Sequence, residues 1–324
     1  MTIAMTDRDI LRELEPVAER HLEEHLRKAK TWNPHDYVPW DDGRNFEALG
    51  GIDWEPGQSG LSEVARVAMV TNLLTEDNLP SYHREIAESF GLDGVWGTWV
   101  NRWTAEENRH SIVMRDYLVV TRAVDPVALE QARMAHMTTG IASPDGPQFL
   151  RGVAYVTLQE LATRISHRNT GTACAEPVAE RMLQRIATDE NLHMVFYRSV
   201  SGAALDLTPN EMMRAITSVV TRFQMPGLTQ PNFRRNAVLL AKHGIYDLRQ
   251  HLDVVLRPVL RAWQVFDRTD LTGDGARARD ELADYLDDLE TKARRFEEQR
   301  ERVRAREAAR AEAAARPRTG VTAQ

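Results

Sequence analysis

Two short motifs constrain the fold of this chain more than any other feature of its sequence. Glu107 and His110 are separated by three positions, and so are Glu190 and His193. Side chains three positions apart on an α-helix point to nearly the same side, so each motif directs a carboxylate and an imidazole toward one place. The sequence therefore predicts two helices that each carry part of a shared polar site.

A further glutamate lies at a matching distance before each motif. Glu76 lies 31 residues before Glu107, and Glu160 lies 30 residues before Glu190. A four-helix bundle that holds a di-iron or di-manganese carboxylate centre needs this layout, a Glu followed by Glu-x-x-His, in each half. The predicted metal ligands are Glu76, Glu107, His110, Glu160, Glu190 and His193.

The residues around the motifs indicate that their carboxylates are buried. A single Glu-x-x-His is weak evidence, since about one is expected by chance in a chain of this size. However, Glu107, Glu160 and Glu190 each lie in the middle of a stripe of apolar residues with helical spacing. A buried carboxylate is costly unless it is paired or binds metal. The competing interpretations are buried polar networks and solvent-facing salt bridges, and the metal site is favoured over both.

The chain is predicted to be all-α. Apolar residues recur with helical spacing through most of the sequence, and few stretches alternate with the period of a β-strand. Several predicted helices exceed about 25 residues, which indicates a long bundle. Helices are expected at 6–29, 61–90, 94–122, 125–140, 148–170, 175–205, 208–224, 230–240 and 245–266, with an irregular segment at 31–60.

The sequence is expected to form one helical-bundle domain over residues 1–275. A highly charged helix should follow at 276–312, as a solvated helix or a partner-facing arm, with a disordered tail at 313–324. Pro16 should disturb the first helix locally. Pro80 lies four residues after Glu76 and removes the usual helical donor to the Glu76 carbonyl. Either the helix breaks there, or a loosened turn beside the metal admits substrate or dioxygen.

Composition excludes several classes of protein. The net charge of −7 argues against general nucleic-acid binding. No apolar run reaches the ~20 residues that a membrane-spanning helix needs, and the N-terminus does not resemble a signal peptide. Cys174 is the one cysteine, which excludes an internal disulfide framework and fits a cytoplasmic location. We expect Cys174 to be a passive residue in a loop or at a helix start.

Four stretches, at 75–82, 103–110, 159–167 and 189–193, resemble the soluble acyl-[acyl-carrier-protein] desaturases, most closely those of actinobacteria. The similarity extends over about residues 6–270, with the motifs in the family's order. It implies a ferritin-like bundle of roughly ten helices, usually homodimeric, with two iron ions per subunit bound by the same six residues. It also implies a dioxygen-dependent enzyme that removes two hydrogens from adjacent methylenes of an acyl chain. The chain would be carried on acyl carrier protein, and electrons would come from a ferredoxin-type donor.

The resemblance implies roles for three further residues. Thr163 matches a threonine beside the oxygen-binding face, although its hydroxyl could instead bond to its own helix. Asp189 matches an acid that orients the imidazole of His110. Trp32 matches a tryptophan that completes an electron route to the iron, the alternative being an interface or core tryptophan. By the symmetry of the two halves, we expect Glu106 to pair with His193.

An acyl substrate would need an apolar tunnel, and acyl carrier protein would need a basic docking patch. Candidate tunnel residues are Met69, Leu73, Trp99, Met114 and Tyr155, for each of which ordinary core packing is the competing interpretation. Candidate docking residues are Arg20, Arg27, Lys28 and Lys30, followed by Arg234 and Arg235.

Two other functions remain open from the sequence. One is another ferritin-like di-iron oxygenase, which would not explain the stretches at 75–82 and 165–169. The other is a non-catalytic iron-binding bundle, but the additional helices after residue 205 favour an enzyme that encloses a substrate.

Overall fold

The structure is a computed structural model that describes residues 5–140, 148–225, 227, 230 and 232–315. Within these ranges the regular structure consists of helices and contains no β-strand, which confirms the all-α prediction. In the same part of the chain, no helix combines the length and the apolar character needed to cross a membrane.

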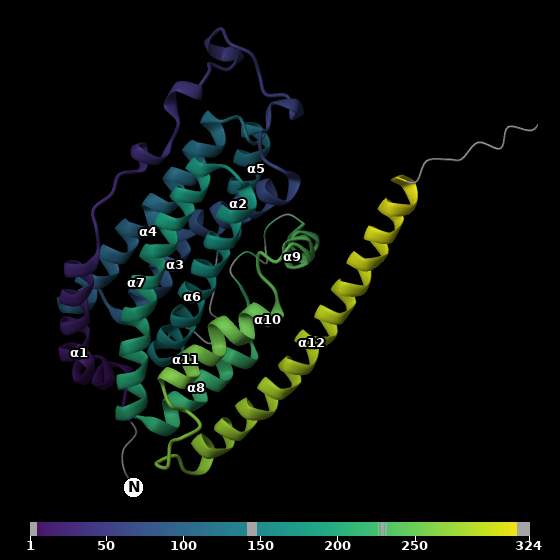
Figure 1. The fold of residues 1–324 in the computed structure, drawn as a ribbon. Helices are drawn as coiled ribbons and strands as arrows, with labels where there is room; N and C mark the ends of the chain where they lie inside the picture. Colours follow the sequence, from purple (N-terminus) through teal and green to yellow (C-terminus); the bar gives the residue numbers. More distant parts are fainter. Residues whose placement is uncertain (1–4, 141–147, 226, 228–229, 231, 316–324) are drawn as a thin grey trace, which may run out of the picture.

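Four helices form the centre of the molecule. They are α2 (Glu63–Asp77), α4 (Gly94–Val120), α6 (Phe149–Cys174) and α7 (Pro177–Leu207). Helix α2 packs against α4 and α6, and α7 packs against the same two helices, so the four close into a ring (Figure 1). Each carries at least one of the predicted metal ligands on its buried side.

The tight junction between α6 and α7 follows from local sequence. The carboxylate of Glu176 accepts hydrogen bonds from the backbone N–H groups of Val178 and Ala179, which caps α7. A Cβ atom at Gly171 would lie only 3.4 Å from the Cα of Glu180. At Gly171 the backbones of α6 and α7 are therefore close enough for a single methyl group to fill the space between them.

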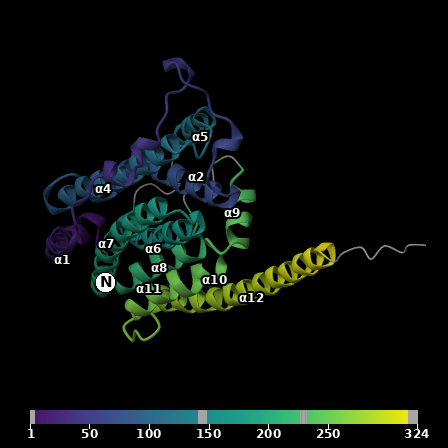
Figure 2. The same cartoon turned by 45° about the horizontal axis from the view of Figure 1, so that its top comes forward.

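Other helices enclose this ring in layers (Figure 2). Helix α1 packs across α4 and α7, α3 packs on α4, α5 and α9 pack on α2, and α8 packs on α6 and α7. Their bounds are α1 Asp7–Lys28, α3 Leu79–Phe90, α5 Pro126–Thr139, α8 Pro209–Thr221 and α9 Phe233–Lys242. The segment predicted to be irregular contains only short 3-10 helices, and it extends past α4 over one end of the bundle (Figure 1).

The helix predicted at 61–90 is two helices. Helix α2 ends at Asp77, and α3 begins at Leu79. Pro80 lies in the first turn of α3, where a backbone N–H would have no acceptor within the helix in any case. The break is therefore the interpretation of Pro80 that the structure supports. In contrast, Pro16 lies within α1, which continues through it.

The helix predicted at 245–266 is also interrupted. The segment consists of α10 (Leu248–Gln250), a π-helix (His251–Leu256) and α11 (Arg257–Ala262). Pro258 explains the interruption, because it cannot donate the hydrogen bond that a continuous α-helix requires. The expected position of Cys174, in a loop or at a helix start, was also wrong. Cys174 is the buried last residue of α6, because that helix continues past 170 until Ala175 adopts a left-handed conformation.

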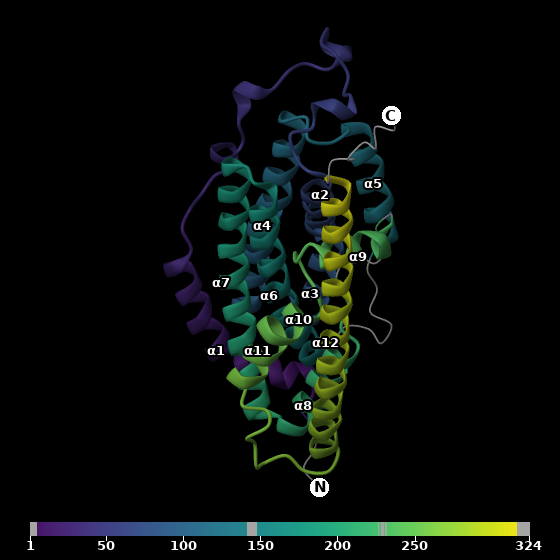
Figure 3. The same ribbon diagram turned by 45° about the vertical axis from the view of Figure 1, so that its right-hand side comes forward.

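The predicted charged helix is α12 (Gly273–Ala315), and it runs along the side of the bundle (Figure 3). Its first half packs on α8, where Leu282 and Leu289 are buried. Beyond Glu301 its described residues are mostly exposed. It includes residues 313–315, which were predicted to belong to the tail, and the remainder of that predicted tail lies outside the described residues.

Candidate metal centre

The structure brings the six predicted ligands together as two overlapping groups in the core. The first contains Glu76, Glu107, His110 and Glu190, and the second contains Glu107, Glu160, Glu190 and His193. In each group one candidate ligand atom per residue lies within 4.8 Å of all the others. Glu107 and Glu190 belong to both groups, which is the arrangement required for carboxylates that bridge two metal ions.

Several atoms of these side chains are buried without a hydrogen-bond partner, which is unusual in a protein core. They are Glu107 Oε1, both ring nitrogens of His110, Glu160 Oε2, Glu190 Oε1 and His193 Nδ1. They lie close to one another, since His110 Nδ1 is 3.1 Å from Glu190 Oε1 and His193 Nδ1 is 2.8 Å from Glu107 Oε1. Carboxylate oxygens with imidazole nitrogens are the donor set of di-iron and di-manganese bundles, so the residues fit such a centre.

The carboxylates repel one another when no cation is bound. Burial and the nearby Glu190 and Glu76 raise the pKa of Glu107 to about 7. Burial, with Glu107 and Glu190, likewise raises the pKa of Glu160 well above its ordinary value. A divalent cation between these groups would favour their charged forms.

Glu76 differs because histidines hold it in its charged form. Burial alone would raise its pKa, but the imidazole of His110, 3.7 Å from Glu76 Oε2, and the hydrogen bond with His167 outweigh this and lower it. His167 Nε2 lies 2.9 Å from Glu76 Oε1, while Asn72 Nδ2 lies 3.3 Å from His167 Nδ1. Sequence reasoning did not assign His167 a role, although it lies on the same helical stripe as Glu160.

Two further contacts fix individual carboxylate oxygens. The indole N–H of Trp103 donates to Glu160 Oε1 at 2.9 Å, which leaves Oε2 of the same carboxylate for another partner. The hydroxyl of Thr163 lies 2.6 Å from Glu190 Oε2, and 3.1 Å from the backbone carbonyls of Gln159 and Glu160. Because charged acceptors form the stronger bonds, donation to Glu190 is favoured over bonding back to its own helix.

Asp189 and Trp32 both lie beside His110. Asp189 Oδ2 is 3.5 Å from His110 Nε2 and accepts the indole N–H of Trp32 at 2.7 Å. The Trp32 ring stacks on the imidazole of His110 with centroids 6.3 Å apart, and the Arg109 guanidinium carbon lies over the Trp32 ring, 4.9 Å from its centroid. The predicted neighbours are therefore in contact, while their roles in catalysis stay a prediction.

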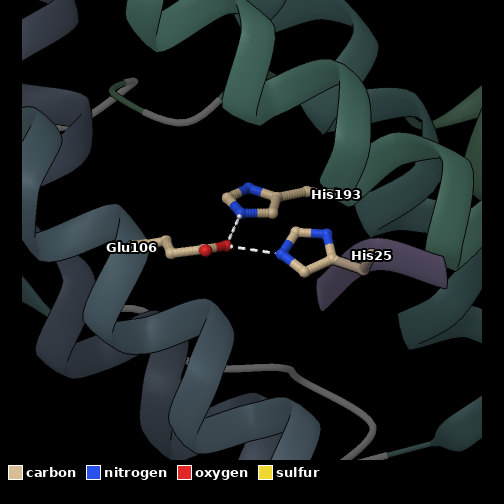
Figure 4. Close-up of side chains that lie close together, drawn as sticks. All are labelled: His25, Glu106 and His193. Carbon is tan, nitrogen blue, oxygen red and sulfur yellow. Dashed lines mark hydrogen bonds and ion pairs between the residues drawn. The ribbon is translucent and has the colours of Figure 1, made fainter. Parts of the chain in front are cut away.

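The expected pair of Glu106 and His193 also forms, with a partner that sequence reasoning missed. Glu106 Oε2 lies 2.9 Å from His193 Nε2 and 2.8 Å from His25 Nε2 (Figure 4). Burial would raise the pKa of Glu106, but its bonds with these two histidines hold it far below the ordinary value. No sequence signal identified His25, since it lies in α1 with no motif around it.

A cavity reaches Glu76, His167 and Thr163 from the side of α9. Its lining combines polar residues of α2 and α6 with apolar side chains, and comprises Thr71, Asn72, Thr75, Glu76, Thr163, Ser166, His167, Met225, Phe233, Ala237, Leu240 and Tyr246. None of the five predicted tunnel residues lines this cavity. Met69, Leu73, Trp99 and Met114 are fully buried in the core, which agrees with their interpretation as packing residues.

Comparisons with known proteins agree with this site. A family model described as fatty acid desaturase matches residues 6–314. DesA1 of Mycobacterium tuberculosis, named as an acyl-[acyl-carrier-protein] desaturase, is 56% identical over 315 residues, which cover 95% of this chain and 93% of the relative. A chloroplastic protein of Oryza sativa subsp. japonica, named acyl-[acyl-carrier-protein] desaturase 4, is 32% identical over 85% of this chain and 71% of its own length.

A solved structure is also similar. The X-ray structure of M. tuberculosis DesA2, titled as an acyl-ACP desaturase, superposes with a TM-score of 0.67 at 32% identity. The match covers 79% of this chain and 94% of that structure. From the family match and these relatives, we conclude that the chain belongs to the fatty acid desaturase family, among the acyl-[acyl-carrier-protein] desaturases.

Proposed function

We propose that this protein is an acyl-[acyl-carrier-protein] desaturase that uses two iron ions and dioxygen to introduce a cis double bond into an acyl chain. The observation that carries the proposal is the pair of buried ligand groups that share Glu107 and Glu190. The names of the similar proteins support the reaction and the carrier of the substrate.

In this proposal the six residues of the two groups are the iron ligands. The bound ions would supply the oxidising chemistry with dioxygen, which no side chain here can supply. The protein supplies position and the exclusion of water. Asp189 and Glu106 orient the imidazoles of His110 and His193, Trp103 orients Glu160, and Thr163 orients Glu190.

The cavity beside Glu76 and Thr163 is the proposed approach for the acyl chain. Phe233, Ala237 and Leu240 of α9 form part of its apolar lining. Methylene groups offer no polar feature to recognise, so the position of the double bond must depend on how deeply the chain enters an apolar space.

The surroundings of this cavity suggest how acyl carrier protein could dock. Arg234 and Arg235 are exposed on α9, next to Phe233 in the cavity wall. The basic residues near the end of α1 are exposed as well, but Lys28 lies 3.7 Å from Glu24 in an ion pair that partly offsets its charge. We therefore place the acidic carrier at α9 in preference to the α1 cluster.

Three parts of the proposal rest on the family resemblance. They are a ferredoxin-type electron donor, a homodimer and a cytoplasmic location. The contact between Trp32 and Asp189 supports an electron route that ends at His110, because it connects the half-buried Arg109 and the buried Trp32 to the neighbour of a candidate ligand.

Turnover of acyl-carrier-protein thioesters tests the proposed reaction. The iron-loaded protein is incubated with ferredoxin, its reductase, NADPH and a panel of acyl chain lengths, and the released fatty acids are analysed by mass spectrometry. We expect one chain length to gain a double bond at one position, and the Glu107→Ala, Glu190→Ala double variant to form no product. Consumption of dioxygen by a fully loaded protein without unsaturated product from any chain would contradict a desaturase and favour an iron-oxidising bundle.

A further inference from the structure

The two ring nitrogens of His193 have different neighbours. Nδ1 lies 2.8 Å from Glu107 Oε1 and 3.4 Å from Glu160 Oε2, on the side of the proposed metal centre. Nε2 lies 2.9 Å from Glu106 Oε2, on the opposite side. If Nδ1 is to bind a metal ion, the ring proton must be on Nε2, where Glu106 accepts it.

Glu106 can therefore accept the N–H of His193 only if its carboxylate is held in one orientation. Its Oε1 accepts a hydrogen bond from Arg102 Nε at 2.7 Å. The Arg102 side chain is 40% exposed, so this charge attracts the carboxylate toward the surface and away from His193. A second contact, on the Oε2 atom that faces His193, is needed to oppose that attraction.

His25 provides the inner contact. Its Nε2 lies 2.8 Å from the same Oε2 atom, and its ring stacks on that of His193 with centroids 5.7 Å apart (Figure 4). Nδ1 of His25 is buried with no hydrogen-bond partner. An unpaired acceptor costs less than an unpaired charge-assisted donor, so the proton belongs on Nε2, and His25 donates to Glu106.

We propose that His25 is a positioning residue for the metal centre, one that acts on His193 through Glu106. This inference rests on the proposed di-iron site and adds a residue of α1 to it. The other half of the bundle has a related arrangement, because the indole N–H of Trp32 donates to Asp189 Oδ2, which lies 3.5 Å from His110 Nε2 without a hydrogen bond to it. In each half, a buried N–H donor holds a carboxylate that lies beside an imidazole of the proposed metal centre.

Metal binding to purified variants tests the role of His25 without relying on catalysis. Cobalt(II) is titrated into the metal-free full chain, and its visible absorption bands report each ion bound. His25→Leu removes the donor, while His25→Gln retains an N–H near the position of Nε2. His21→Asn is the matched control, since His21 is also on α1 but contacts Glu24 instead of Glu106.

We expect His25→Leu to weaken one of the two cobalt sites by about tenfold to a hundredfold. His25→Gln should remain within about threefold of the wild type, and His21→Asn should not change. Far-ultraviolet circular dichroism establishes that each variant is folded at the titration temperature. If His25→Leu is not folded, His25→Met replaces it with a more flexible side chain and carries the same expectation.

Two results would overturn the inference while leaving the proposed function intact. One is a wild type that binds two cobalt ions while His25→Leu binds both with unchanged affinity. The other is an equal loss in His25→Leu and His25→Gln, which would attribute the effect to packing. Failure of the wild type itself to bind two ions would instead contradict the proposed metal centre.

Discussion

At the scale of single residues, the candidate site depends on hydrogen bonds that leave chosen atoms unpaired. Trp103 occupies one oxygen of Glu160, Thr163 occupies one oxygen of Glu190, and in both carboxylates the second oxygen has no hydrogen-bond partner. Buried polar atoms without partners are costly in a protein core. A bound metal ion would provide a partner for these oxygens, so the cost would not arise in the metal-bound protein.

Trp103→Phe should distinguish this role from packing. The substitution removes the donor to Glu160, so we expect metal affinity to fall about tenfold or more, measured by cobalt titration. Trp96→Phe is the matched control, because Trp96 is equally buried but donates its N–H to the backbone carbonyl of Leu11 at 3.2 Å. Both variants should lose stability, about 1–3 kcal/mol, in urea denaturation. Equal metal affinity in the two variants would contradict a specific role for Trp103.

The stability of the metal-free chain should fall as pH rises from about 5 to 7. Glu107 has a pKa of about 7 in the folded chain, against an ordinary value of 4.5. Between these values the unfolded chain releases its proton while the folded chain retains it, so the free energy of unfolding decreases by about 1 kcal/mol per pH unit. Urea denaturation with a chelator present measures this slope. Glu107→Gln should reduce it, and an unchanged slope would be evidence against the assignment.

Other groups of the site do not reverse this direction. His110 and His193 have raised pKa values. Their contribution to the free energy of unfolding is therefore complete below about pH 6.5 and is lost as pH rises through the raised values. Glu106 and Asp189 have lowered pKa values, so their contribution to the free energy of unfolding is lost only as pH falls below about 4.

At the scale of helices, two prolines have opposite effects because of their positions. Pro16→Ala should restore a helical hydrogen bond within α1 and raise the free energy of unfolding by about 1–3 kcal/mol. Pro80→Ala should lower it by about 0.5–1 kcal/mol, because Pro80 lies in the first turn of α3 and restricts the unfolded chain. Urea denaturation of both variants measures the two signs. The same sign for both would contradict this account of the α2–α3 break.

The two halves of α12 should contribute unequally to stability. Leu282 is completely buried in the half that packs on α8, so Leu282→Ala should cost about 2–5 kcal/mol. Removing the residues after Glu301 should cost less than about 1 kcal/mol, since most of those described are exposed. Thermal denaturation of the two variants compares them. A truncation as costly as Leu282→Ala would show that the outer half packs against something that the single chain lacks.

At the scale of the whole molecule, the sequence predicted what is periodic or repeated. The six candidate ligands were found because two copies of Glu then Glu-x-x-His lie at nearly equal spacing, and the structure brings all six together. The all-α class followed from helical spacing of apolar residues. These features are local, so they can be recognised without knowledge of how distant segments pack.

Contacts between distant segments could not be predicted in the same way. His25 meets Glu106 across 81 residues of sequence, and nothing around His25 marks it. The position of Cys174 was missed for a local reason, because the spacing of apolar residues does not mark the left-handed conformation of Ala175 at which α6 ends. The lining of this cavity depends on how α9 packs against α2, and none of the predicted tunnel residues lies in it.

The central claim is that the buried cluster holds two iron ions. The most direct test is the iron content and near-ultraviolet absorption of the full chain after anaerobic loading with ferrous iron and exposure to air, beside the Glu107→Ala, Glu190→Ala variant. The account predicts about two iron ions per chain, with oxo-bridged absorption that the double variant lacks. A correctly folded wild type that binds no iron under these conditions would contradict it.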